Sequence, residues 1–175
     1  MRLAIVGDPG SGKSTFLRFI ALTLAQCVLS GDPLAAATEL ALSPPLPIPL
    51  FLSCWDLAEY LKRVARARVD DIVEFCAERV HEAGWAISRD DLNKVIGEHT
   101  CIILIDGLDE VPTESGRQLL SNLIEDFVAR YPQHRYVVTS RVRAYTGGTV
   151  LGQQFVRCDI QPLPQRNARR SCGTG

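Results

Sequence analysis

Three carboxylates lie directly after the most continuously apolar run of the sequence. Residues 101–105 (CIILI) are followed by Asp106, Asp109 and Glu110 in the stretch LIDGLDE. An unpaired carboxylate at the end of a buried strand is costly, so Asp106 is predicted to bind Mg²⁺. One of the next two acids is expected to orient or deprotonate an attacking water: Asp109 is the first choice, and Glu110 is the other candidate. For Glu110, capping of the next helix is the alternative.

A glycine-rich loop near the N-terminus supplies a phosphate-binding pattern. The segment GDPGSGKST fits G-x-x-x-x-G-K-[ST]. Glycines allow backbone N–H groups to turn inward around phosphate oxygens, and the helix that follows points its positive end at them. Lys13 is predicted to reach the terminal phosphates, and Ser14 to offer its hydroxyl to Mg²⁺. The residues expected to bind nucleotide are Gly7, Asp8, Pro9, Gly10, Ser11, Gly12, Lys13, Ser14 and Thr15.

A third candidate is the arginine in the segment YVVTSR. Residues 136–139 form a strand-like run that is followed by Ser140 and Arg141. A guanidinium at the end of such a strand could sense a terminal phosphate or stabilise charge during its transfer. The alternative for Arg141 is an ordinary surface arginine.

Strands that alternate with helices must position these residues. The strands are predicted at residues 2–6, 50–54, 101–105, 136–139 and 155–160. The helices are predicted at residues 13–28, 35–42, 56–67 with Asp56 as N-cap, 70–83, 88–97 and 114–130. Alternation of this kind implies a parallel sheet covered on both faces. Ligands bind such sheets beyond the carboxyl ends of the strands, where the loop and the acids would meet.

The length of 175 residues suits one domain with a substantial core. We expect the core to occupy residues 1–163 and the polar, basic residues 164–175 to form a disordered tail.

Charge and cysteine content narrow the class of protein. A net charge of -1 gives no general attraction for nucleic acid or for an anionic membrane. None of the six cysteines forms a CxxC pair, which favours buried thiols in a cytoplasmic protein over disulfides or zinc. The apolar run 19–29 is shorter than the ~20 residues of a membrane span, and no signal-peptide cleavage site precedes the glycine-rich loop.

The three segments together resemble the NACHT domain, a branch of the STAND class of P-loop NTPases that is related to AAA+ ATPases. The resemblance covers about residues 2–163 and rests on GDPGSGKST, LIDGLDEV and VVTSR, with weaker matches in PIPLFLSCWDLAEYL and IQPL. It implies a three-layer α/β/α fold with a mainly parallel five-stranded sheet in the additional-strand order of AAA+ proteins. In that order the 136–139 strand lies between the first strand and the acidic one.

The resemblance also implies a function. It indicates a switch that binds and hydrolyses ATP, or GTP, with Mg²⁺, and that is coupled to self-association through NACHT domains in defence or stress signalling of the innate-immunity type. Lys13 would then contact phosphate, Ser14 and Asp106 magnesium, Asp109 and Glu110 water, and Arg141 the terminal phosphate. Because such proteins continue into a helical and a winged-helix domain, the chain is expected to be a fragment.

Other nucleotide-binding classes fit less well. A small P-loop kinase that phosphorylates a small molecule would use the same loop, but DGLDE suits water activation better than phosphoryl transfer to an acceptor. A translational-type GTPase would carry N-K-x-D, and a transporter ATPase an L-S-G-G-Q-like segment; neither motif occurs. The kinase and a non-catalytic nucleotide-binding scaffold stay open as alternatives.

Overall fold

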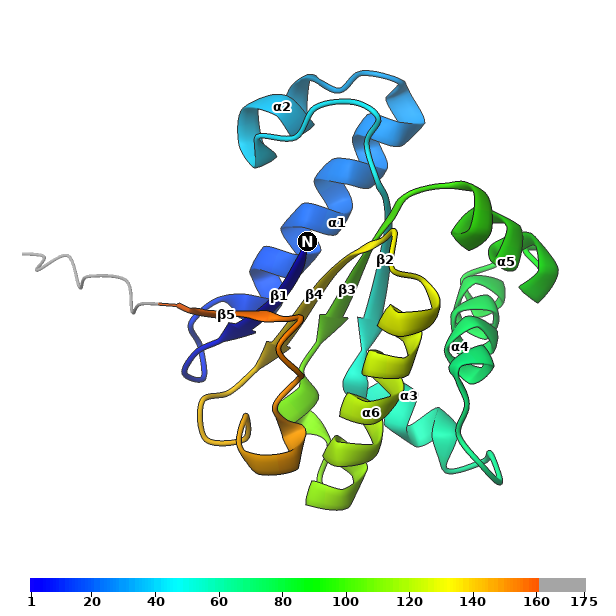
Figure 1. Ribbon diagram of the computed structural model, residues 1–175. Coiled ribbons are helices and arrows are strands. Elements are labelled where there is room, and N and C mark those ends of the chain that lie inside the picture. Colours follow the sequence, from blue (N-terminus) through cyan, green and yellow to red (C-terminus); the bar gives the residue numbers. More distant parts are fainter. Residues whose placement is uncertain (161–175) are drawn as a thin grey trace, which may run out of the picture.

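The computed structural model describes residues 1–160 and centres on five parallel strands (Figure 1). The strands are β1 (Arg2–Val6), β2 (Ile48–Ser53), β3 (Cys101–Asp106), β4 (Arg135–Ser140) and β5 (Val156–Asp159). Their order is β2-β3-β4-β1-β5, and every neighbouring pair is parallel. The predicted position of the 136–139 strand, between the first strand and the acidic one, is therefore confirmed. The predicted tail and the boundary at residue 163 lie outside the described residues.

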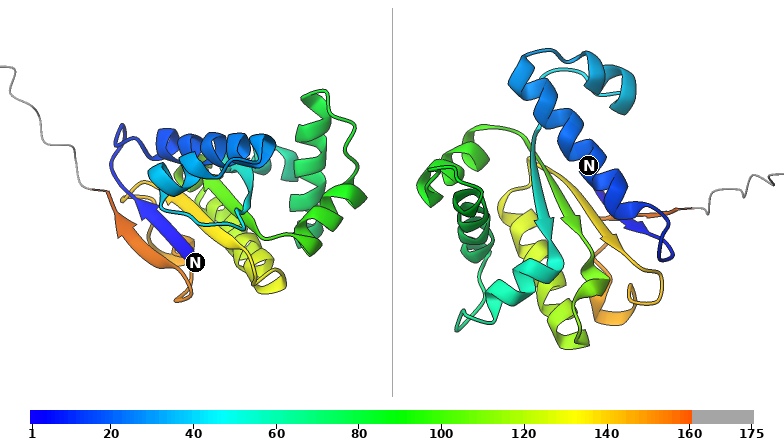
Figure 2. Two further views of the ribbon diagram at one scale, coloured as in Figure 1. Left: turned by 90° about the horizontal axis from the view of Figure 1, so that it is seen from above. Right: turned by 180° about the vertical axis from the view of Figure 1, so that it is seen from behind.

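Helices cover both faces of the sheet (Figure 2). Helices α1 (Lys13–Ser30) and α2 (Leu34–Leu40) lie on one face. The other face carries α3 (Cys54–Leu61), α4 (Val69–Glu82), α5 (Arg89–Glu98) and α6 (Glu114–Arg130). Two short 3₁₀ helices, η1 (Leu108–Glu110) and η2 (Gly147–Thr149), follow β3 and β4 along the chain. This arrangement is the predicted three-layer α/β/α fold.

The alternation of side chains along β3 divides the core into two clusters. Ile102 and Leu104 pack with the α1 side, whereas Ile103 and Ile105 pack with the α3–α6 side. Successive strand residues point to opposite faces, so a strand covered on both sides must be apolar throughout. All six residues of β3 are buried, which confirms the prediction of a central strand.

Two predictions about α3, the helix that follows β2, were wrong. Ser53, not Asp56, is the N-cap of α3, because the Ser53 hydroxyl accepts a 3.3 Å hydrogen bond from the Asp56 N–H. Helix α3 ends at Leu61 rather than near residue 67, since residues 62–68 are mostly exposed and little burial would support further turns.

Helix α6 has its predicted bounds, but its N-cap is Thr113, so Glu110 does not cap it.

Four of the five cysteines within residues 1–160 are buried, and none of these five is paired in a disulfide. Within the same residues, no helix combines the length and the apolar character that crossing a bilayer requires.

Candidate nucleotide site

The carboxyl ends of β1, β3 and β4 meet at one edge of the sheet and enclose a cavity of about 280 Å³. Seven of the nine loop residues predicted to bind nucleotide line it: Pro9, Gly10, Ser11, Gly12, Lys13, Ser14 and Thr15. The remaining lining comes from Asp106, Gly107, Asp109, Glu110, Thr139 and Arg141. The structure thus brings together the three sequence segments that were predicted to share a site.

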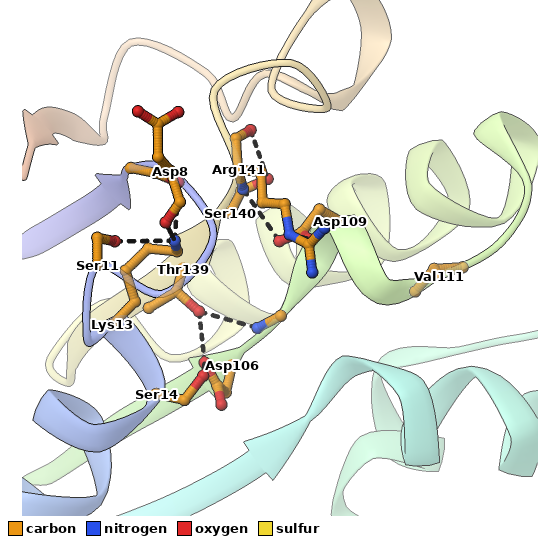
Figure 3. Close-up of polar contacts among 12 residues, drawn as sticks. Asp8, Ser11, Lys13, Ser14, Asp106, Asp109, Val111, Thr139, Ser140 and Arg141 are labelled. Atoms are coloured by element: carbon orange, nitrogen blue, oxygen red, sulfur yellow. Dashed lines mark hydrogen bonds and ion pairs between the residues drawn. The ribbon is translucent and has the colours of Figure 1, made fainter.

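The Lys13 ammonium donates three hydrogen bonds within the glycine-rich loop (Figure 3). Its ammonium donates to the carbonyl oxygens of Gly7 and Asp8 at 2.7 and 2.9 Å, and to Ser11 Oγ at 3.2 Å. Gly7 and Asp8, the two loop residues outside the cavity lining, therefore contribute through these carbonyls. Ser11 gives the longest of the three contacts, so a phosphate oxygen would compete for the Lys13 ammonium most readily there.

The N-terminus of α1 is left open to an anion. Gly12, with φ of 86°, turns the chain into the helix, and no side chain caps the first turn. The first turns of α3, α4, α5 and α6 carry acidic residues, whereas those of α1 and the short α2 have none. Because acidic side chains usually neutralise the positive end of a helix, their absence from α1 fits a bound phosphate.

The two predicted magnesium ligands lie in contact. The Ser14 hydroxyl donates to Asp106 Oδ1 at 3.0 Å (Figure 3). Asp106 is only 8 % exposed, and within residues 1–160 its carboxylate forms no ion pair. A buried carboxylate that has only hydroxyl partners needs a cation, and oxygen ligands are those that Mg²⁺ prefers. Ser14 and Asp106 therefore fit a bound Mg²⁺ ion.

Thr139 is a site residue that the sequence prediction missed. Its hydroxyl donates to Asp106 Oδ1 at 2.6 Å and accepts from the Gly107 N–H at 2.8 Å. Both contacts follow from the register, in which Val138 pairs with Ile105 and places Thr139 beside the end of β3. The signal was the hydroxyl at the end of the YVVTSR strand, which becomes informative only once that strand is placed next to the acidic one.

Asp109 and Arg141 form the second polar link between the ends of β3 and β4. Arg141 Nε lies 2.8 Å from Asp109 Oδ2, and the Arg141 backbone N–H donates to Asp109 Oδ1 at 3.0 Å (Figure 3). Both carboxylate oxygens of Asp109 thus have a donor from the same residue. The two side chains line the cavity together, but they lie there as a pair rather than as separate groups.

Glu110 lies one residue further along η1 and has different surroundings. Its carboxylate is folded back over Gly107, where a Cβ atom would come within 2.8 Å of Glu110 Cδ. Gly107 also has φ of 76°, which a side chain would strain. Glu110 is exposed as a residue, but partial burial of its carboxyl group raises its pKa, the carboxylates of Asp106 and Asp109 raise it further, and Arg141 and Arg18 oppose the rise. Gly107 therefore leaves room for the Glu110 carboxyl group, which has a raised pKa.

A neutral thiol lies close to the same acids. Cys54, the first residue of α3, is fully buried, and its neighbour Ser53 pairs with Asp106 in the β2–β3 register. Burial raises the pKa of Cys54 far above its usual value, and the charges of Asp106, Glu110 and Asp109 act in the same direction. The thiol therefore stays protonated and is no nucleophile at neutral pH.

Comparison with known protein families gives a match over most of the chain. The model of the family described as NACHT domain matches residues 1–171, nearly the whole chain. No curated protein matches the sequence.

Proposed function

The chain belongs to the NACHT domain family of P-loop NTPases, and we propose that it hydrolyses a nucleoside triphosphate, ATP or GTP, with the help of Mg²⁺. The observation that carries the proposal is the contact between Ser14 and Asp106. These residues are 92 positions apart in the chain, yet the fold brings them within 3.0 Å at the opening of a phosphate loop. A hydroxyl and a buried carboxylate at this place form a ligand pair for a metal that accompanies nucleotide phosphates.

The glycine-rich loop and the strand ends would bind different parts of the Mg²⁺-nucleotide. Lys13 and the N-terminus of α1 would bind phosphate oxygens, and Ser14 and Asp106 would hold Mg²⁺. The metal would supply positive charge to the phosphate oxygens as negative charge builds up on the leaving group. Thr139 would keep the Asp106 carboxylate turned toward Ser14 through its 2.6 Å hydrogen bond.

Glu110 is our candidate for the proton acceptor in place of Asp109, the sequence-based first choice. A water oxygen would bond to the terminal phosphorus while its proton passes to Glu110 and the bond from phosphorus to the bridging oxygen breaks. The products are a nucleoside diphosphate and inorganic phosphate. Asp109 is a poorer acceptor, because donors from Arg141 occupy both of its oxygens. The raised pKa of Glu110 suits a group that must take up a proton near neutral pH.

Family membership is the ground on which a signalling role is proposed. We propose that the NTPase core works as a cytoplasmic switch that controls self-association through NACHT domains in defence or stress signalling. Sedimentation of the full-length protein with a diphosphate or with a non-hydrolysable triphosphate tests this step. The proposal expects the two nucleotides to give different oligomeric states, and identical states would contradict it.

Phosphate release tests the hydrolysis. We expect the protein to release inorganic phosphate from ATP or GTP in the presence of Mg²⁺ and to stop when a chelator is added. Ser14→Ala should slow release by at least about tenfold, since loss of one metal ligand removes more than ~1.4 kcal/mol of stabilisation. Ser30→Ala, at the exposed far end of the same helix, is the matched control and should leave the rate unchanged.

Two other outcomes would replace the proposal. Nucleotide binding without phosphate release, with or without added small-molecule acceptors, would favour the non-catalytic scaffold. Transfer of the phosphate to an added acceptor would favour the kinase.

A further inference from the structure

We propose that Arg117 is a positioning residue that holds the turn carrying Glu110 in the place required for proton transfer. The inference rests on the proposed hydrolysis, and it gives a role to a residue that does not line the cavity for the nucleotide. It is carried by the contacts of Arg117 with residues 111–113. We call these residues the exit segment, because they lead from η1 to α6.

The position of Glu110 depends on the backbone that carries it. Its carboxylate has no hydrogen bond or ion pair in the part of the chain that the structure describes, so no side chain fixes it directly. The entrance of η1 is held from the end of β4, through the Gly107 N–H and the Asp109 carboxylate. A general base must lie within hydrogen-bond reach of the water that it deprotonates. The contacts at the exit of η1 therefore also decide whether Glu110 can act.

Arg117 holds the exit segment from the first turn of α6. Its Nη1 donates to the Val111 carbonyl oxygen at 2.8 Å and to the Pro112 carbonyl oxygen at 3.3 Å. Side chains of a helix lean toward its N-terminus, which brings this guanidinium back to the chain that enters the helix. Both carbonyls belong to the residues that directly follow Glu110. The contact therefore fixes the end of the turn that carries the proposed base.

Packing alone does not fix the exit segment. Val111 is buried, and α6 lies so near that a Cβ atom at Gly116 would come within 3.0 Å of Val111 Cγ1. The segment also borders a cavity of about 420 Å³ between α3 and α6. Atoms that face a cavity lack packing partners on that side. The hydrogen bonds of Arg117 therefore supply part of the restraint on this segment.

Arg117 lies in a place that is unfavourable for a cation. It is the fourth residue of α6, near the positive end of the helix, where acidic side chains are favoured. Its Nε is buried without a hydrogen-bond partner among residues 1–160, and its guanidinium forms no ion pair with them. A buried donor without a partner lowers stability. These costs favour a role beyond stability, and the contacts with the exit segment provide one.

Arg117 would act on Glu110 through the backbone rather than by its charge. The cations that lower the pKa of Glu110 are Arg141 and Arg18, whereas the Arg117 guanidinium contacts backbone carbonyls. Loss of Arg117 should therefore displace the Glu110 carboxylate from the attacking water and leave the glycine-rich loop able to bind the nucleotide. Because a displacement of about 1 Å can lower a rate by ~100-fold, the effect should fall on kcat and not on KM.

Steady-state release of phosphate from ATP or GTP with Mg²⁺ tests the inference. Arg117→Met keeps an unbranched side chain without donors, and it should lower kcat by at least about tenfold and keep KM within about twofold. Arg117→Lys can still donate to the Val111 carbonyl oxygen, so its kcat should lie clearly above that of Arg117→Met. Arg130→Met is the matched control: it removes an exposed arginine of the same helix, paired with Asp70, and should change neither constant.

A double variant shows whether Arg117 acts through Glu110. Added to Glu110→Gln, Arg117→Met should cause no further loss of the residual kcat, because the group that it positions is already removed. An arginine that only stabilises the fold would instead lower kcat by the same factor in both backgrounds. An equal factor in both backgrounds, or a wild-type kcat in Arg117→Met, overturns the inference.

Folding and the proposed function are checked separately. Circular dichroism establishes that Arg117→Met folds; if it does not, Arg117→Gln takes its place in the same comparison, with the same deciding outcomes. If the wild-type protein releases no phosphate, the proposed function itself fails. If wild type releases phosphate, Glu110→Gln does so far more slowly, and Arg117→Met matches wild type, only the present inference fails.

Discussion

Thr139 Oγ1 lies 2.6 Å from Asp106 Oδ1 and joins the ends of two neighbouring strands. The same hydroxyl accepts from the Gly107 N–H, so one side chain satisfies two buried polar groups in the turn that carries the acids. Thr139 is 1 % exposed, so its hydroxyl makes these contacts away from bulk solvent. The orientation of the proposed metal ligand therefore depends on a residue of the adjacent strand.

Thr139→Val is predicted to disturb Asp106 without changing the size of the side chain. The substitution removes the hydrogen bond that Thr139 donates to Asp106 and the hydrogen bond that it accepts from the Gly107 N–H. The loss of both should lower the free energy of unfolding by about 1–3 kcal/mol. Thr23→Val is the control, since Thr23 is also buried but its hydroxyl has no hydrogen-bond partner within residues 1–160. Urea unfolding measures both. Equal effects of the two substitutions would contradict the role of Thr139.

Glu110→Gln is predicted to stabilise the protein at neutral pH in the absence of metal and nucleotide. Burial raises the pKa of Glu110 above its usual value of 4.5, so the folded protein holds this proton more tightly than the unfolded chain does. Stability is then lost as pH rises from 4.5 through the raised pKa, because the ionised carboxylate is unfavourable in the folded state. Glutamine cannot ionise and removes this loss.

Urea unfolding of wild type and Glu110→Gln at pH 4 and pH 7 measures the effect. The difference between the two proteins should favour the variant more at pH 7 than at pH 4. Glu98→Gln alters an exposed glutamate that lies away from Asp106 and Asp109, and it should show no comparable gain at pH 7. A Glu110→Gln variant that is no more stable at pH 7, relative to wild type, than at pH 4 would show that the ionised Glu110 carboxylate is not unfavourable in the folded protein.

His134→Asn is predicted to weaken the dependence of stability on acid pH. His134 Nδ1 accepts a 3.2 Å hydrogen bond from the backbone N–H of Cys101 at the start of β3. Burial lowers the pKa of His134 below its usual 6.5, and a backbone contact with Ile96 partly opposes this. The unfolded chain therefore binds the proton first, so stability is complete above pH 6.5 and falls as pH decreases from 6.5 through the lowered pKa.

Asparagine can accept from the same N–H without taking up a proton, so the variant should lose much of the acid-induced fall below pH 6.5. The exposed His81, replaced in the same way, provides the control and should leave the fall intact. Thermal unfolding between pH 5 and pH 8 gives the comparison. Parallel pH profiles for His134→Asn and wild type would show that His134 is not the group responsible.

The sequence predicted the elements well where local pattern decides them. The glycine-rich loop lies between a strand and a helix as expected, and α6 begins and ends at its predicted residues. Asp106 and Ser14 meet because the positions of both are determined by regular elements: β3 ends at Asp106, and α1 begins one residue before Ser14. Parallel strands bring their carboxyl ends to one edge, so the strand order places both side chains at the same edge of the sheet.

The roles of Asp109 and Glu110 could not be separated from the sequence. The two acids are adjacent in a short 3₁₀ turn, and their directions depend on the φ of Gly107 and on which cation is within reach. Arg141 is that cation, 32 positions away, and its contact with Asp109 requires the placement of β4 beside β3. Likewise, the N-cap of α3 is Ser53 rather than Asp56, because the hydroxyl at the end of β2 accepts a hydrogen bond from the first turn, a contact that apolar periodicity does not reveal.

Calorimetric titration of Mg²⁺-nucleotide into wild type and Lys13→Ala tests the central claim most directly. The Lys13 ammonium donates three hydrogen bonds within the glycine-rich loop, and it is the cation proposed to bind the phosphates. Lys62→Ala, which removes an exposed lysine paired with Glu59, is the control and should bind as wild type does. The phosphate-site account predicts that wild type binds ATP or GTP and that Lys13→Ala loses at least about 100-fold in affinity. Unchanged affinity in Lys13→Ala would contradict it.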